Sequence, residues 1–166
     1  GHVQWPCPTL DHPGTPYLYK DNHFDTPTGK GQLFATAWRA PAEIPDEEFP
    51  LVLCTVREVG HYSCRSMTGN CAALQTLADE PGFVQMHPED AQRMGICDQQ
   101  ILWVESRRGK VISRCNYNER INKGAVYMTY QWWIGACNEL TQDNLDPVSK
   151  TPETKYCAVR VEPIID

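Results

Sequence analysis

Short runs of apolar residues, some alternating with polar ones, recur along the chain between polar and proline-containing stretches. Runs of this length and composition are typical of β-strands. The sequence therefore predicts strands at 32–38, 51–56, 83–86, 100–106, 110–115, 125–130 and 156–162. The runs 100–106 and 110–115 flank Arg107-Arg108-Gly109, and two such runs around a glycine turn predict a hairpin.

The clearest helix signal begins at Pro88. Proline is favoured at the first helical position, Glu89 stands in the first turn, and Gly95 is a typical terminator. His87 directly precedes this helix and is expected to occupy the capping position. A second short helix is predicted at 71–78. Six or so short strands with a few short helices predict a mainly β fold, a barrel.

Two long stretches lack this periodicity. Residues 1–31 contain five prolines and four glycines, which predicts an extended arm or linker that lies across another part of the protein. Residues 135–155 are loop-like and contain two dipeptides that are typical of turns, Asp146-Pro147 and Thr151-Pro152. We therefore expect an arm at 1–31 and a single barrel domain at 32–166.

Size and charge narrow the classes of function. A chain of 166 residues fits one domain and can bury about 70% of its unfolded surface, so it needs no metal or disulfide to fold. Lys and Arg total 15 against 21 Asp and Glu, and the net charge of −6 opposes non-specific binding to nucleic acid or an anionic membrane surface. A smaller anion such as a phosphate is still compatible, because local arginines and backbone N–H groups bind it whatever the net charge.

Other features bear on the cellular compartment. No run approaches the roughly 20 apolar residues of a membrane span, and the first residues lack the order of a signal peptide. The eight cysteines are scattered, without the C-x-x-C or short Cys/His spacing of a zinc or iron–sulfur site. We interpret the chain as soluble and cytoplasmic, without membrane insertion, with reduced and mostly buried cysteines. Some disulfides, or a metal site, are the alternatives.

The stretch CTVREVGHYSCRSMTGN, residues 54–70, becomes polar abruptly after an apolar run. A nucleophilic active site around His61, Ser63 and Cys64 is disfavoured. Adjacent sequence positions rarely supply the required geometry, and no G-x-S-x-G motif is present. We therefore expect no catalytic residue in this loop.

Recognition of a ligand is the better hypothesis for this loop. Arg57 offers a planar fork of donors, Glu58 accepts from amines or amides, and His61 and Ser63 can donate or accept. Gly60 allows a ligand to approach the backbone closely. The alternative is a solvated loop in which Arg57 and Glu58 pair with each other.

Two further segments could bind a ligand. The run TYQWWIGACN at 129–138 has three aromatic residues in four positions, which indicates core packing or, at a strand end, a half-wet surface that stacks on a planar ring. The loop at 146–156 carries two lysines and several hydroxyls. It is either part of a binding site or an ordinary turn before the last strand.

Taken together and in order, several segments resemble the C-terminal domain of molybdopterin oxidoreductases. Within that group the chain is most similar to the large subunit of formate dehydrogenase, of the formate–hydrogen lyase type, from about Trp5 to Ile164. The segments are TVREVGHYS (55–63), VQMHPEDAQRMGI (84–96), ILWVESRRGKV (101–111), GAVYMTYQWW (124–133) and NELTQDNLDPVSKTPETKYCAVRV (138–161).

The resemblance implies a six-stranded double-psi β-barrel of the aspartate-decarboxylase-like kind. It also implies that the barrel closes over two molybdopterin guanine dinucleotides, which hold one molybdenum or tungsten atom in the parent enzyme. Carried over position by position, the cofactor-binding residues are Arg57, Glu58, His61, Ser63, Tyr130, Thr154 and Lys155.

The resemblance assigns the catalytic parts to other domains. The selenocysteine or cysteine that ligates the metal, and the cysteines of the iron–sulfur cluster, belong to preceding domains of the same polypeptide, so this chain should neither ligate the metal nor oxidise formate alone. The expected partners are those domains and an electron-transfer subunit. Two alternatives stay open: a nitrate-type oxidoreductase, and a non-catalytic β module that binds carbohydrate or protein through Tyr130, Trp132 and Trp133.

Overall fold

Alternate residues are buried along the strands, so one face of each strand points into a shared interior. In β1 (Leu51–Val56), Leu51, Leu53 and Thr55 are buried and the residues between them are partly exposed. The structure is a computed structural model that describes residues 2–77 and 80–164. The chain divides into two compact units, Gly1–Arg39 and Ala40–Asp166, and each is described by itself.

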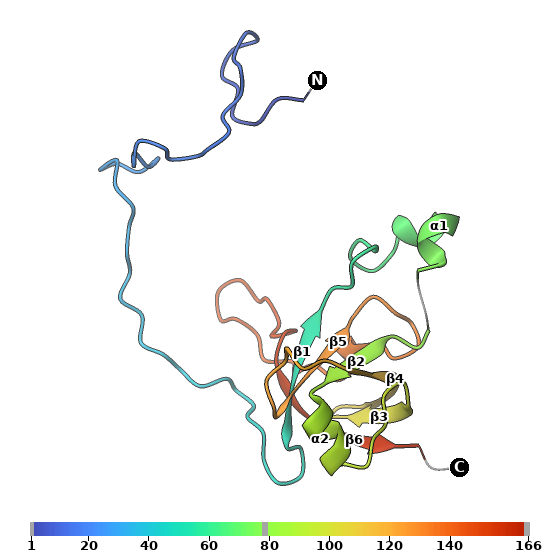
Figure 1. Cartoon of the computed structure of the whole chain (residues 1–166). Coiled ribbons are helices and arrows are strands. Elements are labelled where there is room, and N and C mark those ends of the chain that lie inside the picture. Colours follow the sequence, from blue (N-terminus) through green and yellow to red (C-terminus); the bar gives the residue numbers. More distant parts are fainter. Residues whose placement is uncertain (1, 78–79, 165–166) are drawn as a thin grey trace. The chain divides into compact units, whose positions relative to one another are not determined.

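Six strands of the second unit close into a barrel (Figure 1). After β1 these are β2 (Phe83–Met86), β3 (Ile101–Glu105), β4 (Lys110–Tyr117), β5 (Ala125–Thr129) and β6 (Cys157–Pro163). Their order around the barrel is β1-β5-β2-β4-β3-β6, with β1/β5 and β2/β4 parallel and the other four pairs antiparallel. The predicted six-stranded barrel is confirmed in its strand number and closure, and the predicted hairpin is β3–β4.

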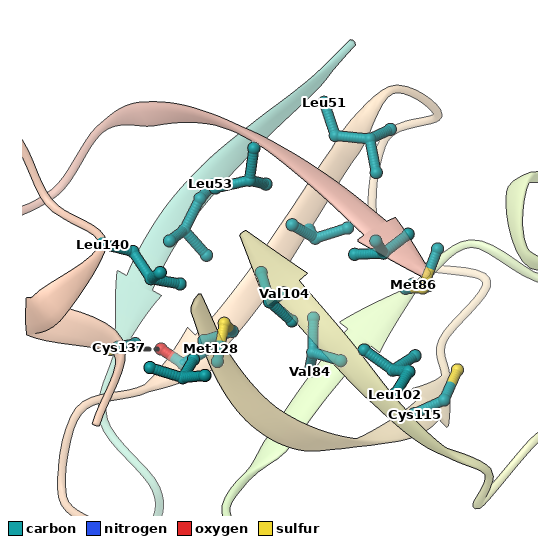
Figure 2. Close-up of a cluster of buried hydrophobic side chains, with 14 of the residues drawn as sticks. Leu51, Leu53, Val84, Met86, Leu102, Val104, Cys115, Met128, Cys137 and Leu140 are labelled. Atoms are coloured by element: carbon teal, nitrogen blue, oxygen red, sulfur yellow. Dashed lines mark hydrogen bonds between the residues drawn. The ribbon is translucent and has the colours of Figure 1, made fainter. Parts of the chain in front are cut away.

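The barrel interior is filled by apolar side chains from its strands (Figure 2). Leu53, Val84 and Leu102 come from three different strands and have no exposed surface. Cys137 and Leu140, from the loop after β5, are equally buried against this cluster. Burying one such aliphatic side chain is worth about 1.5–3 kcal/mol, so the period-two pattern supplies much of the stability of the barrel.

The helix α2 (Pro88–Arg93) begins as the sequence predicts. The His87 side chain accepts a hydrogen bond from the backbone N–H of Glu89 (3.2 Å), which confirms the capping role. Asp90 is 2% exposed and accepts from the Gly124 N–H at 2.6 Å, which ties the helix to the turn before β5.

The other helical segments are short. Residues Thr68–Asn70 form the 3₁₀ helix η1 and Ala72–Gln75 form α1, so the helix predicted at 71–78 is confirmed in its middle, and its last residue lies outside the described residues. A 3₁₀ helix, η2 (Cys137–Glu139), interrupts the loop predicted at 135–155. None of the helices in the described part of the chain has the length and apolar content needed to cross a membrane.

The strand predicted at 32–38 is wrong. These residues are described and lie outside all strands, and Leu33, Phe34 and Trp38 are 100%, 81% and 84% exposed. A strand needs a partner for its backbone N–H and C=O groups, and the closed barrel offers no free edge. The apolar pattern of this segment therefore predicts a strand where the structure has exposed side chains on irregular backbone.

The first unit is held by local contacts. The backbone N–H of Thr15 donates to the Gln4 carbonyl (2.8 Å), and the Tyr19 and Phe24 rings stack at 4.9 Å. Residues 2–39 contain neither helix nor strand, and the arm expected at 1–31 stays a prediction. The boundary expected between residues 31 and 32 stays a prediction.

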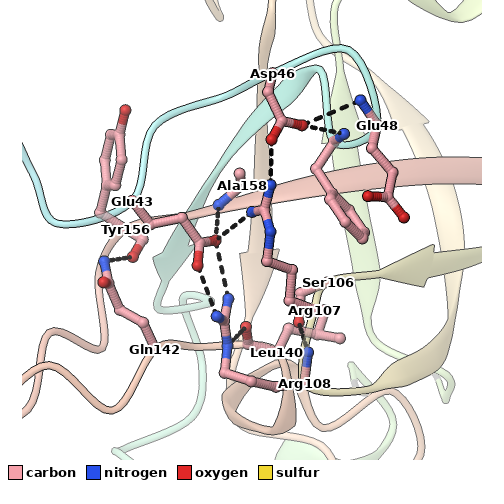
Figure 3. Close-up of polar contacts among 11 residues, drawn as sticks. Glu43, Asp46, Glu48, Ser106, Arg107, Arg108, Leu140, Gln142, Tyr156 and Ala158 are labelled. Carbon is pink, nitrogen blue, oxygen red and sulfur yellow. Dashed lines mark hydrogen bonds and ion pairs between the residues drawn. The ribbon is translucent and has the colours of Figure 1, made fainter.

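A network of charged residues fastens the segment before β1 to the barrel (Figure 3). We call Glu43, Asp46, Arg107 and Arg108 the Glu43 network. The carboxylate of Glu43 accepts two hydrogen bonds from Arg108 (2.6 and 2.9 Å) and one from the Ala158 N–H (2.6 Å), and Asp46 pairs with Arg107. The hydrogen bond from Arg108 lowers the pKa of Glu43. This segment is therefore held by charge on the β3–β4 turn and β6.

All eight cysteines are free thiols. Cys115, Cys137 and Cys157 are buried, and burial raises the pKa of Cys115 and Cys137 to about 12. The expectation that most cysteines are buried is wrong, because Cys7, Cys64, Cys71 and Cys97 are exposed. Three of the four exposed thiols lie in loops of the barrel unit, where the sequence pattern gives no burial signal.

Candidate functional site

Three loops meet at one end of the barrel because of strand direction. β1 and β5 are parallel neighbours, with Val56 opposite Thr129, so both end at the same place. β6 is antiparallel to β1, with Cys157 opposite Leu53, so it begins near that end. The loops after β1 and β5 and the loop before β6 carry the residues that the sequence singled out.

Arg57, Tyr130 and Lys155 lie together, and we call them the Tyr130 cluster. Arg57 Nε donates to the Tyr130 hydroxyl at 2.5 Å, and the guanidinium carbon is 5.9 Å from the ring centroid. Lys155 Nζ is 5.1 Å from the same centroid and donates to the Thr55 carbonyl (3.1 Å). The hydrogen bond to Tyr130 raises the pKa of the exposed Arg57 guanidinium. Two cations therefore share one phenol ring.

Neither cation of the Tyr130 cluster forms an ion pair with a carboxylate anywhere in residues 2–77 and 80–164. Their partners are a neutral hydroxyl and a backbone carbonyl. Within the described residues these two cations are therefore not neutralised by an ion pair, although the chain as a whole is acidic.

Thr154 takes part through its backbone. Its carbonyl accepts a hydrogen bond from the Thr55 hydroxyl (2.7 Å), a contact between the loop before β6 and β1. The next residue, Lys155, donates to the carbonyl of the same Thr55. Thr154 thus fixes the position from which the lysine extends.

Glu58 and His61 turn toward the loop after β5. The Glu58 carboxylate accepts from the indole N–H of Trp132 (3.1 Å) and its backbone N–H donates to Gln131 Oε1 (2.6 Å). His61 is 8% exposed, its Nδ1 lies 3.0 Å from the Thr68 hydroxyl, and its ring meets Trp132 edge-on at 5.8 Å. Arg57 and Glu58, adjacent in sequence, therefore reach different partners.

In this loop one residue has a buried polar atom without a partner, and another has an unusual backbone conformation. Within the described part of the chain, His61 Nε2 is buried and has no hydrogen-bond partner. Ser63 is half-buried with a left-handed backbone (φ 46°). A buried polar atom without a partner costs about 1–3 kcal/mol, so the orphaned ring nitrogen is a site where a ligand atom would restore stability.

The two neighbouring tryptophans have opposite environments. Trp132 is 4% exposed and Trp133 is 84% exposed. A Cβ atom on Gly82 would lie 2.2 Å from the Trp132 ring, so glycine is required for this packing. Trp132 therefore packs in the core, whereas Trp133 lies on a solvent-exposed surface. Together with the following residues they line a hollow of about 160 Å³: Cys64, Tyr130, Gln131, Ala136 and Asn138.

Sequence reasoning missed Gln131 and Arg65. Gln131 is 3% exposed, and its side chain bonds the loop after β1 at two points. Arg65 lies 4.2 Å from the Trp132 ring and donates to the Gln131 carbonyl (2.7 Å). The only sequence signal for Gln131 is a polar residue enclosed by aromatic ones, in Tyr130-Gln131-Trp132.

The fold and these loops define a ligand-binding β-barrel with a cationic and aromatic mouth. Residues 51–158, more than half of the chain, match the family described as "Molydopterin dinucleotide binding domain". The chain belongs to this family, and the resemblance read from its sequence motifs is confirmed.

The similar proteins are much longer than this chain. It is 62% identical over its whole length to "Formate dehydrogenase H" of Escherichia coli (strain K12), of which it spans 23%. It is 41% identical, over 98% of its length, to "F420-dependent formate dehydrogenase 2 subunit alpha" of Methanococcus maripaludis, of which it spans 24%. An "Assimilatory nitrate reductase catalytic subunit" of Bacillus subtilis is more distant, at 36% identity over 99% of this chain and 23% of that protein. The chain therefore corresponds to about a quarter of these relatives.

A solved structure supports the fold. Acetylene hydratase from Pelobacter acetylenicus superposes with a TM-score of 0.67, over 86% of this chain and 25% of that one. At 18% sequence identity this similarity concerns the fold alone.

Proposed function

We propose that the chain binds molybdopterin guanine dinucleotide as the cofactor-binding part of a molybdenum formate dehydrogenase. The observation that carries the proposal is the Tyr130 cluster, where Arg57 and Lys155 lie on one aromatic ring with no carboxylate partner in the described residues. Cations of this kind are suited to an anion with planar rings. The 62% identity to "Formate dehydrogenase H" supports the choice of formate over nitrate.

The residues present fit this cofactor by the chemistry of their donors. Arg57 donates in a planar fork and Lys155 as a point charge, which suits pyrophosphate and carbonyl acceptors. Glu58 accepts from ring N–H groups, and the orphaned His61 Nε2 needs a partner. Tyr130 presents an aromatic ring. The site residues Arg57, Glu58, His61, Ser63, Tyr130, Thr154 and Lys155 are thus proposed to bind and orient the cofactor.

The protein contributes orientation and not the redox step. When bound in the complete enzyme, the cofactor supplies the molybdenum or tungsten centre at which formate is oxidised to CO2 and two electrons are released. The Tyr130 cluster holds its negative charge, and the buried face of Trp132 keeps water from this side of the site.

The remaining parts of the enzyme are proposed outside this chain. They are the preceding domains of the same polypeptide, with a metal-ligating selenocysteine or cysteine and an iron–sulfur cluster, and an electron-transfer subunit. The relatives span about four times the length of this chain, and one of them is named as a subunit alpha. We propose a cytoplasmic location, for which the scattered free thiols are the support.

Trp133, at 84% exposure, favours one other candidate, a non-catalytic module that binds carbohydrate or protein through aromatic side chains. Such a module would not need the two cations. Removal of Arg57 therefore separates the two functions, because it weakens binding of an anion and leaves stacking of a neutral sugar intact.

The test is anaerobic titration of the chain with molybdopterin guanine dinucleotide released from a denatured molybdoenzyme. We expect binding by the wild-type chain and a loss of about tenfold or more in affinity for Arg57→Ala, since a charge-assisted hydrogen bond is worth about 1.5–3 kcal/mol. Arg120→Ala is the matched control, because Arg120 is exposed in the turn before β5, away from the site loops. Equal losses in both variants, or no binding by the wild-type chain, would reject the proposal.

A further inference from the structure

One buried side chain bonds the site loop at two points. Gln131 Oε1 accepts from the Glu58 N–H at 2.6 Å, and its Nε2 donates to the His61 carbonyl at 2.9 Å. We call this pair of hydrogen bonds the Gln131 bridge. It closes the four-residue segment 58–61 from a position 73 residues away from Glu58. The segment includes Gly60, whose φ of 107° no other residue type adopts readily.

Arg65 and Trp132 complete the bridge as a ring of contacts. Arg65 donates to the Gln131 backbone carbonyl (2.7 Å), packs on the Trp132 ring at 4.2 Å and pairs with Glu80 at 3.0 Å. The Trp132 indole N–H donates to the Glu58 carboxylate at 3.1 Å, which closes the ring of contacts. Each residue in this ring is therefore held by two others, and the loop after β1 is joined to the loop after β5.

The backbone of the loop needs such support. Ser63 and Arg65 both have left-handed backbone angles, φ 46° and 63°, and neither is a glycine. Such conformations cost about as much as a weak hydrogen bond each and persist only where other contacts hold them. No helix or strand contains residues 57–67, so hydrogen bonds with side chains such as those of Gln131 and Thr68 support the loop in place of regular structure.

We propose that Gln131 is a positioning residue for the cofactor: through its two hydrogen bonds it fixes Glu58 and His61 in the geometry that receives the ligand. The inference rests on the proposed function. Groups that are already ordered do not lose conformational freedom when a ligand binds, so preorganisation raises affinity. Loss of the bridge should therefore lower affinity while the barrel stays folded.

The test compares three versions of the chain in the same anaerobic titration with molybdopterin guanine dinucleotide. Gln131→Met keeps the length of the side chain and removes both hydrogen bonds, and we expect affinity to fall about tenfold or more. The matched control is Gln100→Met, since Gln100 also accepts from a backbone N–H, that of Cys97 (2.9 Å), in the turn before β3. We expect the control to bind as the wild type does.

Gln131→Glu adds a readout that a purely structural residue would not give. A protonated carboxyl can donate to the His61 carbonyl and accept from the Glu58 N–H, as the amide does, whereas a carboxylate cannot donate. Burial raises the pKa of a carboxyl, so affinity should recover as pH falls from 8 to 5. The titratable groups that face this position are Glu58, His61 and Arg65. The pH dependence of affinity in the wild type and in Gln131→Met, which lack the new carboxyl, shows how much these three groups contribute.

The outcomes separate the two proposals. Binding by the wild type with weaker binding by Gln131→Met and acid recovery in Gln131→Glu supports the positioning role. Equal affinity in the wild type and Gln131→Met, or an identical pH profile in all three chains, overturns the positioning role and leaves the proposed function intact. No binding by the wild type rejects both. An Nε1–H resonance of Trp132 that is unchanged in Gln131→Met would also contradict the inference, because the indole bonds the positioned Glu58.

Discussion

Cations at two places on this barrel have different kinds of partner. In the Glu43 network, Arg108 meets the Glu43 carboxylate through two hydrogen bonds and Arg107 meets Asp46. In the Tyr130 cluster, Arg57 and Lys155 meet a phenol and a carbonyl. Both places bring together segments that are distant in the sequence, so topology alone does not distinguish a contact that stabilises the fold from one that binds a ligand.

The partners distinguish their roles. A partly buried cation is stabilised when a carboxylate neutralises it and satisfies its N–H groups. The Glu43 network meets this condition and so serves the fold. The Tyr130 cluster keeps its charge and its exposed donors, which adds little to stability and provides attraction for an anion. Unpaired cations beside an aromatic ring are thus a better sign of a binding site than the number of charges.

The largest expected effect is on stability, from Glu43→Ala. This change removes the partner of Arg108 and of the Ala158 N–H, and leaving such donors unsatisfied should cost about 2 kcal/mol. Urea unfolding measures the loss. The exposed Glu47 gives the control Glu47→Ala, for which we expect less than about 0.5 kcal/mol. Equal losses of unfolding free energy in Glu43→Ala and Glu47→Ala would show that the Glu43 network stabilises the fold no more than an ordinary surface charge does.

The opposite result is expected from Lys155→Met. Its affinity for molybdopterin guanine dinucleotide should fall about tenfold, since a charge-assisted contact is lost, whereas its unfolding free energy should change by less than about 0.5 kcal/mol. Lys150→Met is the control in the same loop, where Lys150 donates to the Pro147 carbonyl. A loss of stability as large as that of Glu43→Ala would mean that the Tyr130 cluster is structural.

Acid should weaken the Glu43 network and leave the Tyr130 cluster unchanged. Arg108 lowers the pKa of Glu43 below its ordinary 4.5 in the folded chain. A group with a lowered folded pKa contributes stability that is present above its unfolded pKa and is lost as pH falls through the folded pKa. The wild type should therefore lose its advantage over Glu43→Gln as pH falls below about 4.5. Unfolding of both chains at pH 3 to 7 tests this, and a constant difference would contradict it.

The sequence predicts the strands well because the barrel imposes a strict alternation. Leu51, Leu53 and Thr55 point inward in the register that their pattern predicts. The same kind of pattern fails at 32–38, where Leu33 and Trp38 are exposed. Local composition cannot indicate whether a partner strand is available, and that condition decides the outcome.

The site is predictable only in part, for a related reason. Motif order suffices to nominate Arg57, Tyr130 and Lys155, which strand direction then brings together. The Gln131 bridge depends on a contact between residues 73 positions apart and on left-handed backbone in the loop, neither of which has a local signature. For the same reason the inward position of His61 could not be read from its polar neighbours.

The smallest expected effect is a difference in thiol reactivity between the mouth of the barrel and its interior. Cys64 is exposed and lines the hollow beside Tyr130 and Trp133, whereas Cys137 is buried, and burial raises its pKa to about 12. Because the thiolate is the reactive form, a thiol reagent at pH 8 should modify Cys64 and leave Cys137 unmodified until the chain unfolds.

The cofactor sharpens this comparison. If it occupies the mouth, it should slow modification of Cys64 several-fold and leave Cys97, which is exposed in the turn before β3, unaffected. Peptide mass mapping after brief labelling distinguishes the two sites. Equal protection of both thiols would indicate a general change in the chain, and no protection of Cys64 would place the ligand away from the hollow. Since the reagent changes no charge of the Tyr130 cluster, this measurement locates the ligand independently of the arginine and lysine variants.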